Sequence, residues 1–219
     1  MIDKFSNIFD GLKAAYGTYK INGRDTKGKA TGKATVVKES RTTETWEAHL
    51  SGQQSIGIIP INEDNQCKWG CIDVDEYNFN HQELIERLQK AKLPLVVCRS
   101  KSGGAHVFLF TTEFIPAKDM QETLKRLAIS LGYGSCEIFP KQIVLHLERG
   151  DVGNFLNTPY FDHENGLRYA FKPDGTAATI EEFFDLYDQN VQTHEQVLAL
   201  KVEDDPDLPL KDGPPCLQM

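Results

Sequence analysis

The feature that most constrains the fold is an apolar run carrying two carboxylates, GCIDVD at residues 70–75. Side chains alternate between the two faces of a strand, so Asp73 and Asp75 project from one face while Ile72 and Val74 face a core. Side chains two residues apart on one face are separated by roughly 6.5–7 Å. Both carboxylates can therefore reach into one small volume.

Paired carboxylates of this kind predict a site for a divalent cation. Two anions held together without a counter-ion repel each other, and each tends to take up a proton. A bound Mg²⁺ or Mn²⁺ removes this repulsion, because both ions prefer oxygen ligands. The alternative is that Asp73 and Asp75 lie on a solvent-facing strand surface or in the turn that follows. The rest of the chain has to decide between these interpretations.

The composition excludes several classes of protein. The chain has 219 residues, of which 40% are hydrophobic and 26% charged, as in an ordinary globular protein. No apolar run approaches the ~18 residues of a membrane span, and the first residues lack a signal-peptide pattern. The five cysteines lack metal-ligand spacing, which favours reduced thiols over zinc. We therefore expect a cytoplasmic protein without a membrane partner.

One stretch is basic although the net charge of the chain is −8. Residues 20–41 contain seven basic and two acidic side chains, and 23–34 are rich in Gly, Lys and Thr, which predicts a loop. Such a stretch can contact the phosphates of a nucleic acid, or it can be a solvated loop. Our candidates for template contact are Lys27, Lys29 and Lys33.

Hydrophobic periodicity and capping signals predict an α+β fold with helices packed on one face of a sheet. Helices are expected at 5–16, 43–50, 81–92, from Asp119 to Gly132, at 180–189 and at 193–201. Strands are expected at 56–60, 70–75, 95–100, 105–110 and 168–171, and a hairpin at 136–139 and 143–147. We expect the strand at 56–60 to be an antiparallel neighbour of the aspartate strand.

The turn RSKSGG at 99–104 joins two predicted strands and has the properties of a phosphate site. It offers two hydroxyls, two cations and glycines that let backbone amides turn toward an anion. His106 follows at the start of a core strand, where its imidazole can donate to a phosphate oxygen. A Ser-Gly turn or a strand histidine can also be purely structural, but the two together are more specific.

Glu137 is a third acidic candidate. It lies between Cys136 and Ile138 on a predicted strand, where an unpaired charge is costly unless it faces solvent, a partner or a metal. Its partner can be a metal ion shared with the two aspartates, or the nearby cation of Lys141.

The order of these motifs resembles the archaeo-eukaryotic primase superfamily. The residues that carry the resemblance are IDVD at 72–75, SKSGGAHVF at 100–108 and EIFPKQ at 137–142. Within that superfamily the chain is most similar to the primase-polymerases of phages, mobile elements and conflict systems. SIGIIPI ahead of the aspartates and GNFLNTPYF at 153–161 fit the same frame, so the resemblance covers about residues 5–190.

The resemblance implies a role for each matched residue. Asp73, Asp75 and Glu137 would hold two divalent cations, Mg²⁺ or Mn²⁺, one activating a 3′-hydroxyl and the other holding the triphosphate. The incoming nucleotide would be bound by residues of three segments: Arg99, Ser100, Lys101, Ser102, Gly103, Gly104 and His106, then Lys141 and Gln142, then Asn154 and Asn157.

The implied fold is a small N-terminal α/β module joined to a palm sheet that resembles an RNA-recognition motif (RRM), together spanning residues 1–200. Residues 201–219 read as an acidic, proline-rich linker toward a further C-terminal region. The implied protein is a primase or DNA polymerase of bacterial, phage or mobile-element origin. Its partners would be a single-stranded DNA template and primer, NTPs or dNTPs, and a helicase or that C-terminal region.

Two other functions remain open from the sequence. A metal-dependent nuclease would use the same carboxylates to activate water, but it does not need the phosphate turn at 99–104. A non-catalytic module that binds nucleotides or nucleic acid would tolerate alanine at Asp73 and Asp75.

Overall fold

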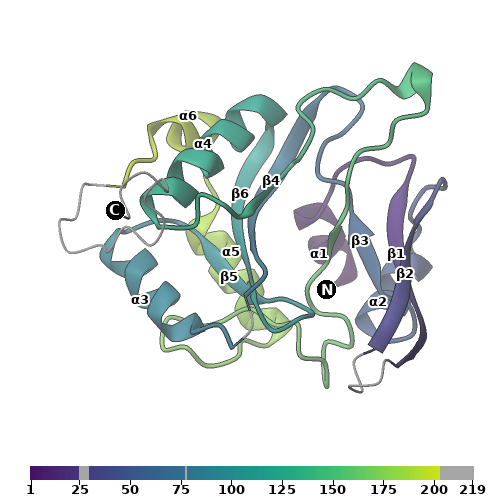
Figure 1. The fold of residues 1–219 in the computed structure, drawn as a ribbon, viewed down its shortest axis with the longest axis horizontal. Helices are drawn as coiled ribbons and strands as arrows, with labels where there is room; N and C mark the ends of the chain where they lie inside the picture. Colours follow the sequence, from purple (N-terminus) through teal and green to yellow (C-terminus); the bar gives the residue numbers. More distant parts are fainter. Residues whose placement is uncertain (25–29, 77, 203–219) are drawn as a thin grey trace, which may run out of the picture.

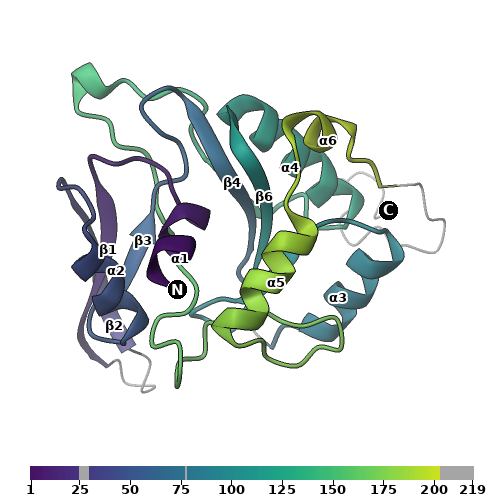
Figure 2. The same ribbon diagram turned by 180° about the vertical axis from the view of Figure 1, so that it is seen from behind.

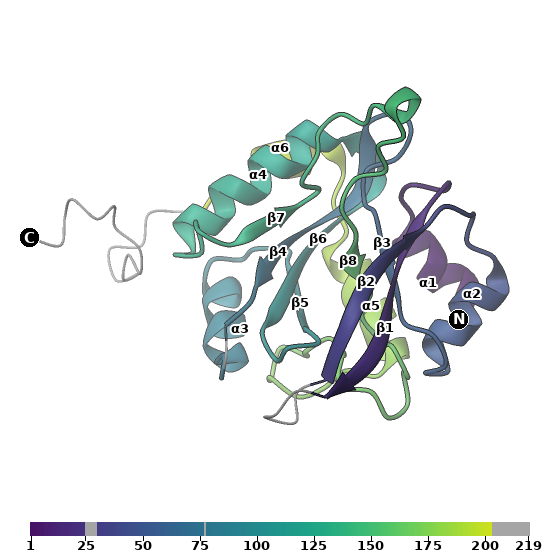
Figure 3. The same ribbon diagram turned by 45° about the vertical axis from the view of Figure 1, so that its right-hand side comes forward.

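The computed structural model describes residues 1–24, 30–76 and 78–202, with only the backbone described at 20–24, 30 and 31. Figure 1 labels its helices α1–α6 and strands β1–β6, and Figure 3 also labels β7 and β8. They are α1 (Ile2–Ile8), β1 (Tyr16–Arg24), β2 (Ala30–Val37), α2 (Thr43–Leu50), β3 (Ile56–Ile58), β4 (Gln66–Val74), α3 (His81–Lys90), β5 (Val96–Arg99), β6 (Ala105–Pro116), α4 (Ala117–Ser130), β7 (Glu137–Phe139), the 3₁₀ helix η1 (Leu147–Arg149), β8 (Leu156–Asn157), α5 (Ile180–Asn190) and α6 (His194–Ala199).

The strands form two four-stranded sheets. The N-terminal sheet has the order β2-β1-β3-β8, and the palm sheet has the order β5-β6-β4-β7. All strand pairs in both sheets are antiparallel. Figure 3 shows the two sheets beside each other, with the segment between β7 and β8 running from one to the other.

The palm sheet has the topology of an RRM. Along the chain its elements run β4-α3-β5-β6-α4-β7, which is a βαββαβ unit, and the first and third strands of this unit are central in the sheet. The α+β class and the RRM-like palm expected from the sequence are therefore confirmed. The N-terminal module, with α1, α2 and the other sheet, is confirmed as well.

Helices cover both faces of the palm sheet, so the prediction of a single covered face was wrong. On one face Leu84 of α3 and Leu124 of α4 share a core with Ile72 of β4. On the other face lie α1 and α5, which Figure 2 shows from behind. Their side chains Phe5 and Phe183 belong to a second core. The strands are apolar on both faces, which is why the sheet is covered twice.

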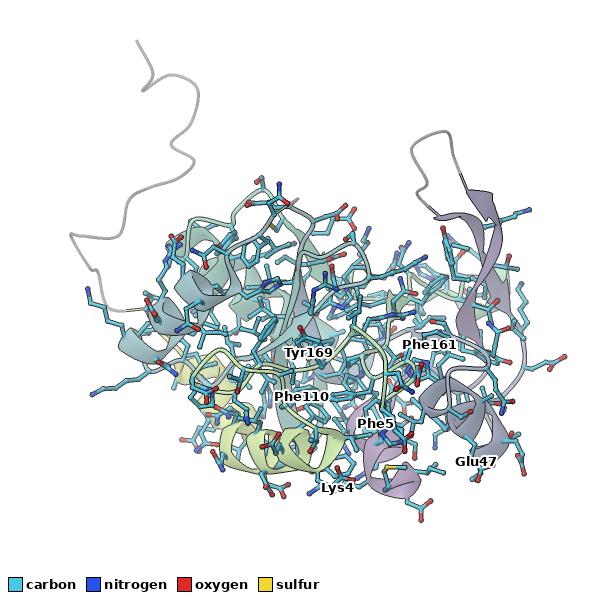
Figure 4. All side chains as sticks on the ribbon, turned by 90° about the horizontal axis from the view of Figure 1, so that it is seen from below. Lys4, Phe5, Glu47, Phe110, Phe161 and Tyr169 are labelled. Atoms are coloured by element: carbon cyan, nitrogen blue, oxygen red, sulfur yellow. The ribbon has the colours of Figure 1, made fainter. Side chains whose placement is uncertain are left out.

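Aromatic rings fill the core between the palm sheet, α1 and α5. Phe9 lies 5.6 Å from Phe110 and 5.9 Å from Phe183, measured between ring centroids. Figure 4 shows Phe5 and Phe110 in the interior and Lys4 at the surface of α1. This core braces the face of β4 and β6 from which the aspartates project.

Three predicted elements at the N-terminal side differ from the structure. The helix expected at 5–16 ends at Ile8, because the backbone N–H of Leu12 donates to the carbonyl oxygen of Ile59 instead of continuing the helix. The basic loop expected at 23–34 is largely strand, since Ala30–Val37 pairs with β1; residues 25–29 lie outside the described part.

The strand at 56–60 is not a neighbour of the aspartate strand. It ends at Ile58, pairs with β1 and β8, and belongs to the other sheet. Pro60 has no N–H to donate, so the ladder does not continue past this point. The two strands are consecutive in sequence but lie in different layers.

The prediction of a hairpin at 136–147 is correct for its first strand and wrong for its second. Glu137–Phe139 forms β7, but 143–147 forms no strand; the N–H of Leu145 donates to the side chain of Asn65 at 2.7 Å. The strand expected at 168–171 consists of isolated bridges, one of which joins Ala170 to Cys98. The linker expected at 201–219 lies outside the described residues from 203 onward.

Candidate active site

The site is built on one row of residues across the palm sheet. Cys98 of β5, His106 of β6, Asp73 of β4 and Glu137 of β7 are direct cross-strand partners in register. Directly opposed residues of antiparallel strands project from the same face. The sheet therefore gathers the histidine and two of the three predicted acids on one line, although they are far apart in sequence.

The third acid, Asp75, lies just beyond the end of β4 and is held by the predicted phosphate turn. Ser102 donates from Oγ to Asp75 Oδ1 at 2.8 Å, and the hydroxyls of Ser100 and Ser102 are 3.1 Å apart. A Cβ atom on Gly104 would lie 2.1 Å from the carbonyl oxygen of Val74, so glycine is needed for the turn to approach β4 this closely.

The electrostatics of the row follow from burial and crowding. The pKa of Asp73 is raised from 3.8 to about 6. Burial is the largest cause, and the negative charges of Asp75 and Glu137 add to it. Burial and the positive charge of Arg168 lower the pKa of His106 to about 4. Its Nε2 lies 3.4 Å from Asp73 Oδ1. At neutral pH the imidazole is therefore neutral and can donate its one N–H to the aspartate.

Glu137 forms an ion pair with Lys141, whose Nζ lies 2.6 Å from Oε2. The charge of Lys141 also acts on Asp73, where it lowers the pKa against the larger raising effects. Across the residues that the structure describes, no three His, Cys, Asp or Glu side chains converge as a ligand group for a metal. The donor set of three carboxylates fits Mg²⁺ or Mn²⁺ in kind, while Glu137 is engaged by the lysine.

The acidic row opens into a cleft of about 770 Å³ between the two sheets. The predicted site residues that line it are Asp73, Asp75, Ser100, Lys101, Ser102, His106, Glu137, Lys141, Asn154 and Asn157. Four segments that are distant in sequence thus meet at one cavity. This volume is in the range of small-molecule sites.

Four other predicted residues do not line the cleft. Arg99 donates to the carbonyl oxygen of Leu167 at 3.4 Å, and Gly103 and Gly104 shape the turn. Gln142 braces the loop by bonding both the side chain and the backbone N–H of Asn154. Of the proposed template contacts, Lys33 is exposed on β2, and Lys27 and Lys29 lie outside the described residues.

Sequence reasoning missed several residues of the site. Tyr19, Phe139 and Phe155 line the cleft. Arg168 is mostly buried, which lowers its pKa to about 10, and no carboxylate in the described chain pairs with it. A buried cation beside a histidine is a signal that appears only in three dimensions, because Arg168 lies far from His106 along the chain.

Comparisons with known proteins identify the family of the chain. They place the chain in the class of archaeo-eukaryotic primase domains. More narrowly, residues 12–198 match the family described as "TOTE conflict system, Archaeo-Eukaryotic Primase domain", and the chain belongs to this family. A search of curated proteins found no match.

Among solved structures, the chain is similar to the catalytic domain of primase Repb' in complex with initiator DNA. The identity is 10% and the TM-score 0.39, over 91% of this chain and 96% of that one. Within the described part of this chain, no helix has the length and apolar character needed to cross a membrane.

Proposed function

We propose that the chain is a template-directed nucleotidyltransferase, a primase or a DNA polymerase, that adds nucleoside triphosphates to a 3′-hydroxyl on single-stranded DNA. The observation that carries the proposal is the row of His106, Asp73 and Glu137 at one wall of a nucleotide-sized cleft, with Asp75 beside it. Membership of a primase family supports the same reaction class.

In this proposal the acids of the palm sheet and the hydrogen-bond donors beside them have separate tasks. Asp73, Asp75 and Glu137 would hold Mg²⁺ or Mn²⁺, which neutralises the negative charge of the triphosphate and of the leaving pyrophosphate. Lys141 offsets acidic charge when the site is empty, and its ion pair with Glu137 has to open before that carboxylate can act as a ligand. In the free protein the Ser102 hydroxyl donates to Asp75, and the one N–H of the neutral His106 faces Asp73. To bind phosphate oxygens, these donors and the hydroxyl of Ser100 would exchange their present partners for the nucleotide.

The basic stretch at residues 20–41 is the proposed contact for the template. Neutralising Lys27, Lys29 and Lys33 together is expected to weaken binding of single-stranded DNA and to reduce the dependence of affinity on salt. Each lost phosphate contact lowers the slope of log K against log [salt] by about 0.7 for single strands. An unchanged slope in a salt titration would show that these three lysines do not contact phosphates.

The test is a synthesis assay on single-stranded DNA with and without an annealed primer. Reactions contain Mg²⁺ or Mn²⁺ with NTPs or dNTPs, beside an Asp73→Asn/Asp75→Asn variant and an exposed control, Glu122→Gln. Products without primer establish a primase, and extension only from primer establishes a polymerase. Degradation of template that needs the two aspartates indicates the nuclease, and bound nucleotide without any product indicates the binding module.

A further inference from the structure

The cleft has two walls of different chemistry. The palm sheet and its turn provide the acids, hydroxyls and histidine described above. The facing wall comes from the N-terminal sheet and the segment that leads into β8, and its side chains are mainly apolar. They are Tyr19, Ala34, Val36, Phe155 and Leu156, with the amides of Asn154 and Asn157.

The ring of Phe155 packs directly against the backbone of two glycines. Gly17 of β1 and Gly57 of β3 are direct cross-strand partners. A Cβ atom on Gly17 would lie 2.2 Å from Cγ of the Phe155 ring, and one on Gly57 would lie 2.3 Å from Cδ2. The ring is therefore pressed against bare backbone, and any side chain at either position would push it into the cleft.

Glycine is unfavourable within strands, so two glycines paired across adjacent strands need a reason. Neither Gly17 nor Gly57 has a positive φ, so backbone conformation does not require glycine there. What both positions share is the close approach of the Phe155 ring. The pair is thus a seat that fixes one face of the ring and leaves Phe155 only half-buried, toward the cleft.

Tyr19 extends this surface. It lies two residues after Gly17 on β1, so its side chain projects from the same face of the sheet as the seat. Lys101 of the phosphate turn reaches across the cleft and places Nζ 2.9 Å from the centroid of the Tyr19 ring. The aromatic surface therefore lies opposite the turn proposed to bind phosphates, within the reach of one lysine side chain.

We infer that the Phe155 ring, seated on Gly17 and Gly57 with Tyr19 beside it, is the stacking platform for a nucleobase of the bound nucleotide. This inference rests on the proposed function and deepens it. A nucleotide has an anionic end and an aromatic end, and the cleft offers an anion-binding wall and an aromatic wall across from each other. Stacking on protein rings tolerates every base, because each base has a π-face.

The wall also predicts weak discrimination among bases. Selection of a base needs hydrogen bonds to its edge, and the side-chain oxygen of Asn154 already accepts from Gln142. The other amide on this wall is that of Asn157. We expect purines to bind more tightly than pyrimidines in proportion to ring area, with little preference between A and G.

The test measures the binding of a nucleoside triphosphate and of inorganic tripolyphosphate, each with Mg²⁺, to full-length variants. Phe155→Ala is expected to weaken the binding of dATP by about tenfold or more and to leave that of tripolyphosphate unchanged. Phe155→Trp retains the platform and should bind dATP as the wild type does. Gly17→Ala adds a methyl group that displaces the Phe155 ring from the two glycines. This variant should weaken dATP binding although every aromatic side chain is retained.

Phe184→Ala is the matched control, because this partly buried ring lies on α5 outside the cleft. Equal losses for dATP and tripolyphosphate in Phe155→Ala would overturn the inference, as would unchanged binding of dATP. If the Phe155→Ala variant synthesises product as the wild type does, this inference alone would be overturned. If dATP binding depends on Phe155 while tripolyphosphate binding does not, and the protein makes no product, the proposed function alone would be overturned.

Discussion

Replacing Asp73 with asparagine is expected to stabilise the metal-free protein at neutral pH. The side chain of Asp73 is only 23% exposed, and its pKa is raised from 3.8 to about 6 by burial and by the charges of Asp75 and Glu137. The ionised carboxylate is therefore less favourable in the folded protein than in the unfolded chain. At about 1.4 kcal/mol per unit of pKa, the difference amounts to about 3 kcal/mol, which Asp73→Asn would relieve.

The sign of the pH dependence follows from proton linkage. Because the pKa of Asp73 is higher in the folded state, the folded protein holds this proton more tightly than the unfolded chain does. The contribution of Asp73 to stability therefore falls as the pH rises from about 4 to about 6, and stays low above that. Below the unfolded pKa of 3.8, the carboxyl is protonated in both states, and the variant should have no advantage there.

Urea unfolding in a chelating buffer measures the free energy of unfolding across this range. Near pH 7.5, we expect Asp73→Asn to exceed the wild type by up to about 3 kcal/mol, or to unfold about 6–12 °C higher. Asp151→Asn, an exposed change in the loop after η1, should match the wild type. Equal stability at pH 7.5, or an advantage that persists unchanged near pH 4, would refute this account of the site.

Three further predictions address the same site. Mg²⁺ or Mn²⁺ should raise the unfolding temperature of the wild type and not that of Asp73→Asn; a wild type that is indifferent to both ions would contradict a cation at these carboxylates. Arg168→Gln should raise the pKa of His106 above about 4, because it removes a positive charge that lowers it; an unchanged midpoint in an NMR titration would show that the charge does not reach the ring. Gly104→Ala, whose methyl would lie 2.1 Å from the Val74 carbonyl oxygen, should displace the turn and reduce nucleotide binding with the circular dichroism retained; wild-type affinity would mean that the turn is not part of the site.

The acidic half of the site was open to prediction because its signals are local. The alternation in residues 70–75 correctly placed Asp73 on the face opposite Ile72, and Glu137 was marked by its position on an apolar strand. The helix that begins after Thr179 was also readable, since its capping box is a contact between neighbours in sequence. What such signals do not contain is register, and the row from His106 to Glu137 exists only because three strands align.

The errors lie where a distant partner overrides local preference. Residues 9–12 have the spacing of a helix, but Leu12 finds its hydrogen-bond partner at Ile59. Residues 143–147 have the composition of a strand, but this segment has to cross from the palm sheet to the N-terminal sheet, and the N–H of Leu145 is taken by Asn65. In each case a tertiary contact decides the conformation, and no window of sequence contains both partners.

The same distinction separates the two walls of the cleft. Acids, hydroxyls and a histidine are rare within apolar strands, so each one on the palm wall is conspicuous in the sequence. The facing wall depends on Gly17, Gly57 and Phe155, which come from three separate strands or strand ends and are individually ordinary. They form a binding surface only in the folded protein, where the Phe155 ring packs against the backbone of the two glycines. A sequence can therefore indicate the chemistry of a primase-like site well before it indicates how the rest of the substrate is held, because reactive groups are recognised by type and a binding surface only by shape.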